Sequence, residues 1–223
     1  MLSIVIPTFN DGHRLPPTLE RLSAYEGPKE LIVCDAGSGD QTFSLTAKAG
    51  GKFYMAPEGR GQQLAMGADV SVGEWILFLH ADTKLGPGWG TAVNRFIEKP
   101  ANRFRAAYFI FALDDPAPRA RRLERLVEWR CQSLALPYGD QGLLINRAFY
   151  ERIGGFSPIP LMEDVDLIRR IQKHRLECLP ALAITSAERY QKDGYLMRPL
   201  KNLFCLGLFM LGVSPQVINN IYR

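Results

Sequence analysis

The fold is most constrained by a series of short apolar segments, separated by helix-like ones, in the first 100 residues. Residues 2–6 and 75–79 are apolar at nearly every position, without regular alternation between apolar and polar side chains. Such segments are typical of strands buried on both faces, as in a parallel sheet between layers of helices. The predicted strands are 2–6, 30–34, 52–55 and 75–79, and the predicted helices are 14–25, 40–48, 62–70 and 89–97. This alternating order predicts an α/β fold.

The second half of the chain is less regular. The expected elements are strands at 104–113 and 138–145 and helices at 119–133, 146–153 and 163–173. The helix at 119–133 repeats arginine and leucine at helical spacing, so its basic face is either solvated or a surface for an anionic or membrane-bound partner. Because no repeat or linker interrupts the sequence, we expect one domain over residues 1–223.

Composition and charge exclude several classes of protein. Hydrophobic residues make up 47% and charged residues 22%, which excludes a disordered or collagen-like chain. Lys and Arg total 27 and Asp and Glu total 23, so the net charge is +4. This surplus is too small to indicate a nucleic-acid partner, and we expect none. It is compatible with an anionic small molecule or an acidic membrane surface.

The cysteines indicate the compartment. Their spacing matches no metal site or redox pair, which predicts a reduced, cytoplasmic environment. The four are Cys34, Cys131, Cys178 and Cys205. No leader is recognised at the N-terminus. The apolar residues 203–213 are fewer than the ~20 that span a bilayer. We expect a packed helix there, with a helix lying on the inner face of the membrane as the alternative.

The first of three acidic turns begins at Asp35, at the end of the second predicted strand. The residues that follow it are small, so backbone N–H groups there can approach a ligand. Asp35 itself can accept hydrogen bonds from a nucleobase or a ribose. The alternative is an ordinary turn in which Asp40 caps the next helix.

The second turn contains His80 and Asp82 after the apolar residues 75–79. A carboxylate at the mouth of a parallel strand suits a divalent cation such as Mg²⁺, which prefers oxygen ligands and retains substrate phosphates. The alternative is a solvated Asp82 at an ordinary strand end. His80 is expected to be a hydrogen-bonded structural residue, since Mg²⁺ does not favour its nitrogen.

The third turn, Glu163-Asp164, begins the helix expected at 163–173. A carboxylate there can serve as a general base. Acidic residues are also favoured in the first turn of any helix by its dipole. In an α/β sheet, ligands collect beyond the carboxyl ends of the strands. We therefore expect Asp35, Asp82 and Asp164 to meet at one pocket on that edge.

These motifs, in this order, resemble the family 2 glycosyltransferases, which adopt the GT-A fold. The resemblance lies in SIVIPTFN at 3–10, LIVCDAGSGD at 31–40, GEWILFLHAD at 73–82 and Glu163-Asp164. More narrowly, YGDQG at 138–142, GGF at 154–156 and LMEDVD at 161–166 are similar to a small bacterial subgroup of transferases associated with radical-SAM or selenoprotein-domain genes. The likeness extends over nearly the whole chain.

The resemblance implies a role for particular residues. It places Pro7, Thr8, Asp35, Arg60 and Asp82 on the donor side, with Asp82 binding a divalent cation, Mg²⁺ or Mn²⁺. It makes Asp164 the catalytic base and places Asp140, Gln141 and Glu163 near the donor sugar or the acceptor. Residues 1–100 would bind the nucleotide, 101–190 would face the acceptor, and 191–223 would form a helical tail.

The implied reaction moves a sugar from a UDP- or GDP-sugar to an acceptor hydroxyl, a lipid-linked acceptor being one possibility, with inversion at the anomeric carbon. Two positions depart from the family pattern. Ala36 stands where a second acid usually follows Asp35, and His80 stands where the metal-binding motif usually has its first acid.

Two other functions remain open from the sequence. One is a non-catalytic module that binds a nucleotide sugar or a lipid phosphate, its metal site lost around His80. The other is a sugar-phosphate nucleotidyltransferase, which the loop at 7–12 disfavours because it contains no lysine. Lys192 and Arg198 could face a phosphate, but nothing near them distinguishes them from solvated surface residues.

Overall fold

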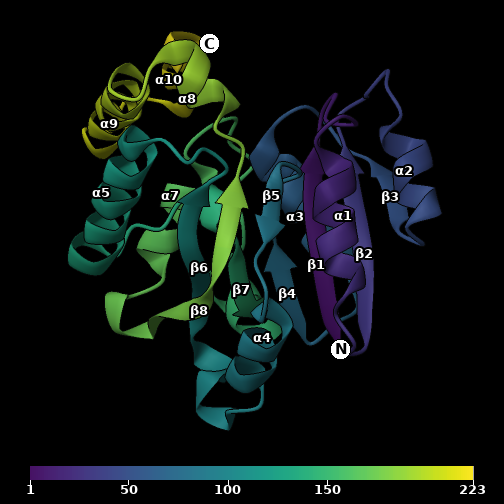
Figure 1. Ribbon diagram of the computed structural model, residues 1–223. Helices are drawn as coiled ribbons and strands as arrows, with labels where there is room; N and C mark the ends of the chain where they lie inside the picture. Colours follow the sequence, from purple (N-terminus) through teal and green to yellow (C-terminus); the bar gives the residue numbers. More distant parts are fainter. Residues whose placement is uncertain (223) are drawn as a thin grey trace.

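The computed structural model describes residues 1–222, which form one eight-stranded sheet with helices on both faces (Figure 1). The strands are β1 (Leu2–Thr8), β2 (Lys29–Asp35), β3 (Lys52–Met55), β4 (Trp75–Phe78), β5 (Thr83–Leu85), β6 (Ala106–Leu113), β7 (Leu143–Asn146) and β8 (Leu176–Thr185). Their order is β3-β2-β1-β4-β7-β6-β8-β5. Residues before and after position 100 therefore share one sheet.

The helices of the first half of the chain follow the predicted order. The α-helices of residues 1–222 are α1 (Leu15–Ser23), α2 (Thr42–Lys48), α3 (Arg60–Val70), α4 (Trp89–Ile97), α5 (Pro118–Leu134), α6 (Arg147–Arg152), α7 (Glu163–Arg170), α8 (Glu188–Asp193), α9 (Met197–Met210) and α10 (Pro215–Tyr222). The expected α/β fold, a largely parallel sheet flanked by helices, is confirmed.

The apolar runs of β1 and β4 serve two cores. Successive side chains of a strand point to opposite faces, and here both faces are covered. Ile4 and Leu77 pack in the core that contains residues of α1 and α4. Val5 and Ile76 pack in the core that contains residues of α3 and α7. Because both faces of these strands are buried, a polar side chain at every second position would place unpaired polar groups in a core. The strands are therefore apolar at nearly every position.

The direction of the strands brings three chain segments together at one edge of the sheet. β1, β2 and β4 are parallel, and β7 runs antiparallel to β4 and β6. β8 is parallel to β6, so it ends at the same edge as β4. The segments that follow β4 and β8, and the turn that precedes β7, therefore meet there.

Several predicted elements of the second half need correction. The single strand expected at 138–145 is a 3₁₀ turn, Gly139–Gln141, followed by β7, because Gly142 has a positive φ of 63° that interrupts the strand. The helix expected at 163–173 ends at Arg170, where Ile171 is already extended. The strand expected at 104–113 begins at Ala106, after a 3₁₀ turn at Pro100–Phe104.

Two strands were not predicted at all. β5 has only three residues, and β8 contains Pro180, which normally argues against a strand inside a sheet. The ladder between β6 and β8 passes from the pair Phe109–Leu179 directly to Ile110–Leu182, which leaves Pro180 and Ala181 in a bulge. A bulge accommodates a residue that cannot donate to the ladder.

Candidate active site

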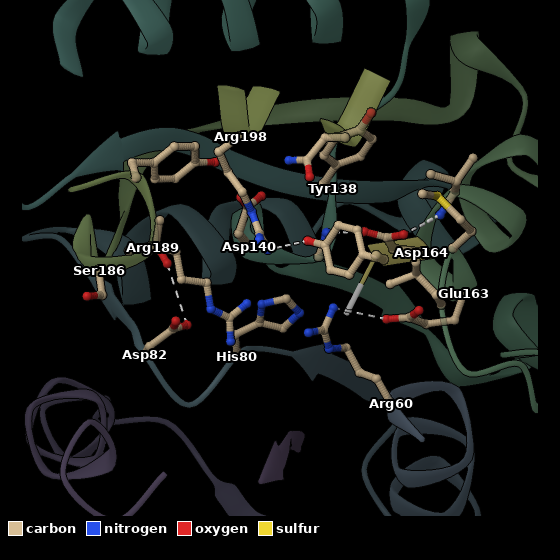
Figure 2. Close-up of a pocket in the computed structure, with 18 residues that line it drawn as sticks. Arg60, His80, Asp82, Tyr138, Asp140, Glu163, Asp164, Ser186, Arg189 and Arg198 are labelled. Atoms are coloured by element: carbon tan, nitrogen blue, oxygen red, sulfur yellow. Dashed lines mark hydrogen bonds and ion pairs between the residues drawn. The ribbon is translucent and has the colours of Figure 1, made fainter. Parts of the chain in front are cut away.

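A cleft lies beyond this edge of the sheet and collects charged side chains from separate segments (Figure 2). Carboxylates and guanidinium groups turn towards one another in it. The predicted site residues that line the cleft are Arg60, Asp82, Asp140, Glu163 and Asp164. His80 also lines it, together with Arg189, Arg198, Asn202 and Tyr222 from the C-terminal helices. Two of the three acidic turns, those at 80–82 and 163–164, therefore meet at one site.

Asp164 is held in place by the turn at Gly139. Its Oδ2 accepts a hydrogen bond of 2.8 Å from the backbone N–H of Gly139. A Cβ at position 139 would lie 2.6 Å from Nε2 of His80, so only glycine allows this approach of the backbone. The residue before α7, Met162, has a φ of 67°, a conformation that a side chain disfavours. This left-handed residue directs the start of α7 into the cleft.

Glu163, beside Asp164, is almost completely buried, with 1% of its surface exposed. Its Oε1 lies 3.4 Å from a terminal nitrogen of Arg60, which is a weak contact for an ion pair. Its Oε2 has no hydrogen-bond partner within residues 1–222. Burial raises the pKa of Glu163 to about 7, and Asp164 adds to the rise while Arg60 opposes it.

Asp140 and His80 complete the buried part of the cleft. Burial raises the pKa of Asp140 to about 6, against the opposing charge of Arg130. Burial, with the charges of Arg60 and Arg189, lowers the pKa of His80 well below its ordinary value, so this imidazole is neutral. Oδ1 of Asp140 and Nε2 of His80 are buried and have no partner in the described part of the chain.

Asp82 lies at the mouth of the cleft, where its Oδ1 is 3.5 Å from the hydroxyl oxygen of Thr185. No group of three or more His, Cys, Asp or Glu residues within 1–222 is arranged to hold a metal ion. A single carboxylate nevertheless fits Mg²⁺ or Mn²⁺ when water and substrate phosphates supply the other ligands. Asp82 meets that requirement.

Asp35, Thr8 and Pro7 do not line the cleft. Asp35 is fully buried, and its carboxylate accepts hydrogen bonds from Thr8 Oγ1 at 2.8 Å, from the N–H groups of Gly37 and Ser38 at 2.9 and 2.6 Å, and from Ser38 Oγ. These bonds fix the turn that follows β2. The predicted contact of Asp35 with a nucleotide stays a prediction.

Gln141 is likewise occupied inside the protein. Its amide nitrogen donates to the carbonyl of Phe109 at 3.1 Å, and its amide oxygen accepts from Arg130 at 3.1 Å and from the N–H of Tyr138 at 3.3 Å. Gln141 therefore anchors the turn that presents Asp140. The predicted contact of Gln141 itself with a ligand is not tested by this arrangement.

The sequence did not reveal how the C-terminal helices complete the cleft. Arg198, which seemed no different from a surface residue, lines the cleft and pairs with Asp193 at 3.0 Å. Asn202, one turn further along α9, lines it too and has a buried Oδ1 without a partner in residues 1–222. Lys192 is exposed and lies outside it. The only signal was the occurrence of polar residues four positions apart in an apolar helix.

Comparison with known proteins gives a consistent result. The family model described as glycosyl transferase family 2 matches residues 3–152. A relative of Staphylococcus haemolyticus, 4,4'-diaponeurosporenoate glycosyltransferase, is 30% identical over 92 residues, which cover 38% of this chain and 24% of that protein. This chain thus matches about a quarter of that relative's length.

Two solved structures share the fold. That of S. aureus TarS 1-349 in complex with UDP-GlcNAc has a TM-score of 0.64 and 14% identity, and it covers 99% of this chain and 70% of its own. That of the mannosyltransferase PcManGT from Pyrobaculum calidifontis, in complex with GDP-Man and Mn²⁺, has a TM-score of 0.62 and 18% identity, and it covers 82% of this chain and 56% of its own. The expected GT-A architecture is confirmed.

Proposed function

The chain belongs to glycosyl transferase family 2, and from this premise we propose that it transfers a sugar from a nucleotide-sugar donor to an acceptor hydroxyl at the cleft lined by Asp82 and Asp164. The observation that carries the proposal is the set of buried polar atoms left unpaired in that cleft. They belong to His80, Asp140, Glu163 and Asn202. Buried polar groups are normally hydrogen-bonded, so their presence together supports a ligand with several hydroxyl groups.

The proposed donor is a UDP- or GDP-sugar, in keeping with the complexes of the two structural neighbours. Arg60, Arg189 and Arg198 face the cleft, and a guanidinium group suits phosphate oxygens because it can donate two parallel hydrogen bonds. We propose that Thr8, Pro7 and Asp35 bind the nucleoside part of the donor, outside the residues that line the cleft. Direct contact by Asp35 would require it to exchange one of its present partners.

In this proposal Asp82 holds a divalent cation, Mg²⁺ or Mn²⁺, together with the donor's phosphates. When bound, such a cation neutralises negative charge on the departing nucleoside diphosphate. His80 is neutral and lines the same cleft, so it can contact the donor without adding charge. The replacement of an acid by His80 makes Asp82 the principal carboxylate at this position.

Asp164 is the proposed general base. The N–H groups of Gly139 and Val165 donate to its two oxygens at 2.8 and 2.7 Å, which fixes the orientation of the carboxylate. Each oxygen retains acceptor capacity for an incoming hydroxyl. Asp164 would take the proton of that hydroxyl as its oxygen attacks the anomeric carbon from the side opposite the leaving diphosphate. Attack from that side inverts the configuration.

Glu163 and Asp140 are proposed to bind the transferred sugar or the acceptor. Their raised pKa values, about 7 and about 6, mean that each can donate a hydrogen bond when protonated and accept one when ionised. As part of the same proposal, the acceptor is linked to a lipid, and the chain belongs to the subgroup of transferases associated with radical-SAM genes. The motifs YGDQG and LMEDVD support the subgroup assignment.

The direct test combines binding and turnover. UDP- and GDP-sugars are screened by thermal shift with and without Mn²⁺, because a ligand that binds only the folded state raises the apparent melting temperature. Calorimetry of the nucleoside diphosphate with Mn²⁺ should then show binding that Asp82→Ala loses. Unchanged metal-dependent binding by that variant would remove the proposed role of Asp82. Binding without hydrolysis or transfer of the donor would favour the non-catalytic module instead.

A further inference from the structure

Helix α9 presents a row of large apolar side chains to solvent, in addition to the apolar residues that it buries against the protein. The residues Leu196, Leu200, Leu203, Phe204, Met210 and Leu211, which we call the outward face of α9, are each between 45% and 83% exposed. Pairs of these residues are three, four or seven positions apart, which places the set on one side of the helix. In a surface helix of a globular protein this stripe normally faces the core. A continuous exposed apolar patch of this kind indicates a binding surface.

The orientation of α9 is fixed by contacts on its other side. Cys205 and Leu206 are buried in the core that also contains Ile218 of α10. Arg198 pairs with Asp193 and donates to the hydroxyl of Tyr222. Turning the outward face inward would break these contacts and remove α9 from the wall of the cleft. The exposed apolar surface is therefore a property of the folded protein.

Cations border the outward face. Residues 194–222 contain no Asp or Glu, and of their two cations Lys201 is partly exposed while Arg198 lies on the inner side of the helix. Lys192 is exposed on α8, immediately before this segment. The guanidinium of Arg119 lies 4.8 Å from the ring centre of Tyr195, which brings the basic start of α5 next to the start of α9. Figure 1 shows α5, α8, α9 and α10 gathered at one end of the molecule.

We propose that the outward face of α9 is a docking surface for an anionic lipid membrane. Apolar side chains would enter the boundary between headgroups and acyl chains, while the bordering cations meet the lipid phosphates. A second copy of the chain fits less well, because two-fold pairing of this face would bring the same cations together. The proposal concerns this surface alone and does not depend on the reaction in the cleft.

The length of the helix determines how it would meet the bilayer. The 14 residues of α9 extend for roughly 21 Å, and no helix within the described residues is long and apolar enough to cross a membrane. The helix would therefore lie in the plane of the interface. Because Arg198 and Asn202 on its inner side line the cleft, docking would hold the cleft at the lipid surface.

Vesicle flotation of the full chain tests the proposal. We expect the protein to float with vesicles of equal parts phosphatidylcholine and phosphatidylglycerol at low salt, and to float less at high salt or with phosphatidylcholine alone. Phe204→Glu and Leu211→Glu should each lower the bound fraction, with a loss of affinity of about ten-fold or more, because each removes a large apolar side chain from the lipid.

The matched control is Phe43→Glu on α2, at the opposite end of the molecule (Figure 1). Phe43 is 62% exposed, close to the 57% of Phe204, so the same substitution on a helix leaves membrane binding unchanged if the outward face is specific. Circular dichroism checks that all variants are folded. The proposal is overturned if the wild-type chain ignores anionic vesicles, or if Phe204→Glu floats as well as the wild type. It is also overturned if light scattering shows a dimer that Phe204→Glu dissociates while vesicles bind neither protein.

Discussion

Two clusters of polar side chains lie at the same edge of the sheet, and they differ in how their hydrogen bonds are satisfied. Around Asp35, every donor and acceptor meets a partner from the protein: Thr8, Gly37 and Ser38 supply them. In the cleft, four buried polar atoms have none within residues 1–222. The first cluster holds a loop in shape through its own hydrogen bonds, whereas the second leaves these four atoms without a partner from the described residues.

The two clusters should respond differently to mutation, because unpaired polar atoms have an energetic cost. A buried polar atom without a partner costs roughly 1–3 kcal/mol, and a bound molecule that supplies the partner recovers that cost. Removing a partner from the satisfied cluster creates the same penalty. Mutations in the cleft should therefore affect catalysis and ligand affinity, and mutations around Asp35 should affect stability.

Asp164→Asn should reduce kcat by roughly 10²–10⁴-fold, since an amide cannot accept the proton of the acceptor hydroxyl. The measurement is steady-state transfer once a donor is identified, with donor affinity followed separately and expected to change little. Asp166→Asn, the same substitution two residues along α7, is the matched control, because Asp166 bonds to Ser157 and Arg170 outside the cleft. Near-normal transfer by Asp164→Asn would refute its assignment as base.

Glu163→Gln should change how the stability of the ligand-free protein depends on pH. With a pKa raised from 4.5 to about 7, Glu163 binds a proton in the folded state where the unfolded chain has released it. The contribution of this extra proton to the free energy of unfolding is therefore present below pH 4.5. It is lost as the pH rises to about 7, a change of about 3 kcal/mol at most. The variant lacks this loss, so relative to wild type it should gain stability from pH 4 to pH 8.

Denaturant unfolding at the two pH values measures this gain. The substitution also alters the contact with Arg60. Any part of the resulting loss of stability that does not depend on pH is the same at both pH values, so it cancels when the two measurements are compared. His80 contributes equally to both proteins, because its lowered pKa keeps the imidazole neutral in the folded state while it titrates in the unfolded chain, so its effect cancels as well. Asp69→Asn, at an exposed position of α3 outside the cleft, is the control for an acid-to-amide substitution. An equal pH dependence for Glu163→Gln and wild type would contradict the raised pKa.

Asp35→Asn should destabilise the protein by about 2 kcal/mol, because the amide group cannot accept hydrogen bonds from all four donors. Chemical unfolding at neutral pH measures the loss, again with Asp69→Asn as the control. If Asp35 also contacts the nucleoside, the affinity for the nucleoside diphosphate should fall in addition. Lost affinity with unchanged stability would mean that the carboxylate is less important to the loop than its hydrogen bonds suggest.

The sequence predicted the first half of the fold well and the second half less well. The strands around 2–6 and 75–79 were recognisable because burial on both faces leaves almost no polar position. β5 was hidden by its length and β8 by Pro180, since the bulge that accommodates this proline exists only when β6 lies alongside. The segments around Asp82 and Asp164 were recognisable because short-range turn chemistry and a known motif coincide there.

The parallel core of the sheet and the acidic turns at its edge can be predicted from the sequence, since both follow from side-chain periodicity and local chain geometry. Which polar groups remain unpaired depends on the folded protein. Asp35 has the more suggestive motif, yet Thr8 and Ser38 satisfy it, while Asn202 and Arg198, in a segment without a motif, reach the cleft. The same holds for α9, whose apolar stripe is ordinary in sequence. Hydrogen bonding and burial depend on neighbours distant in the chain, and for that reason local pattern could not assign them.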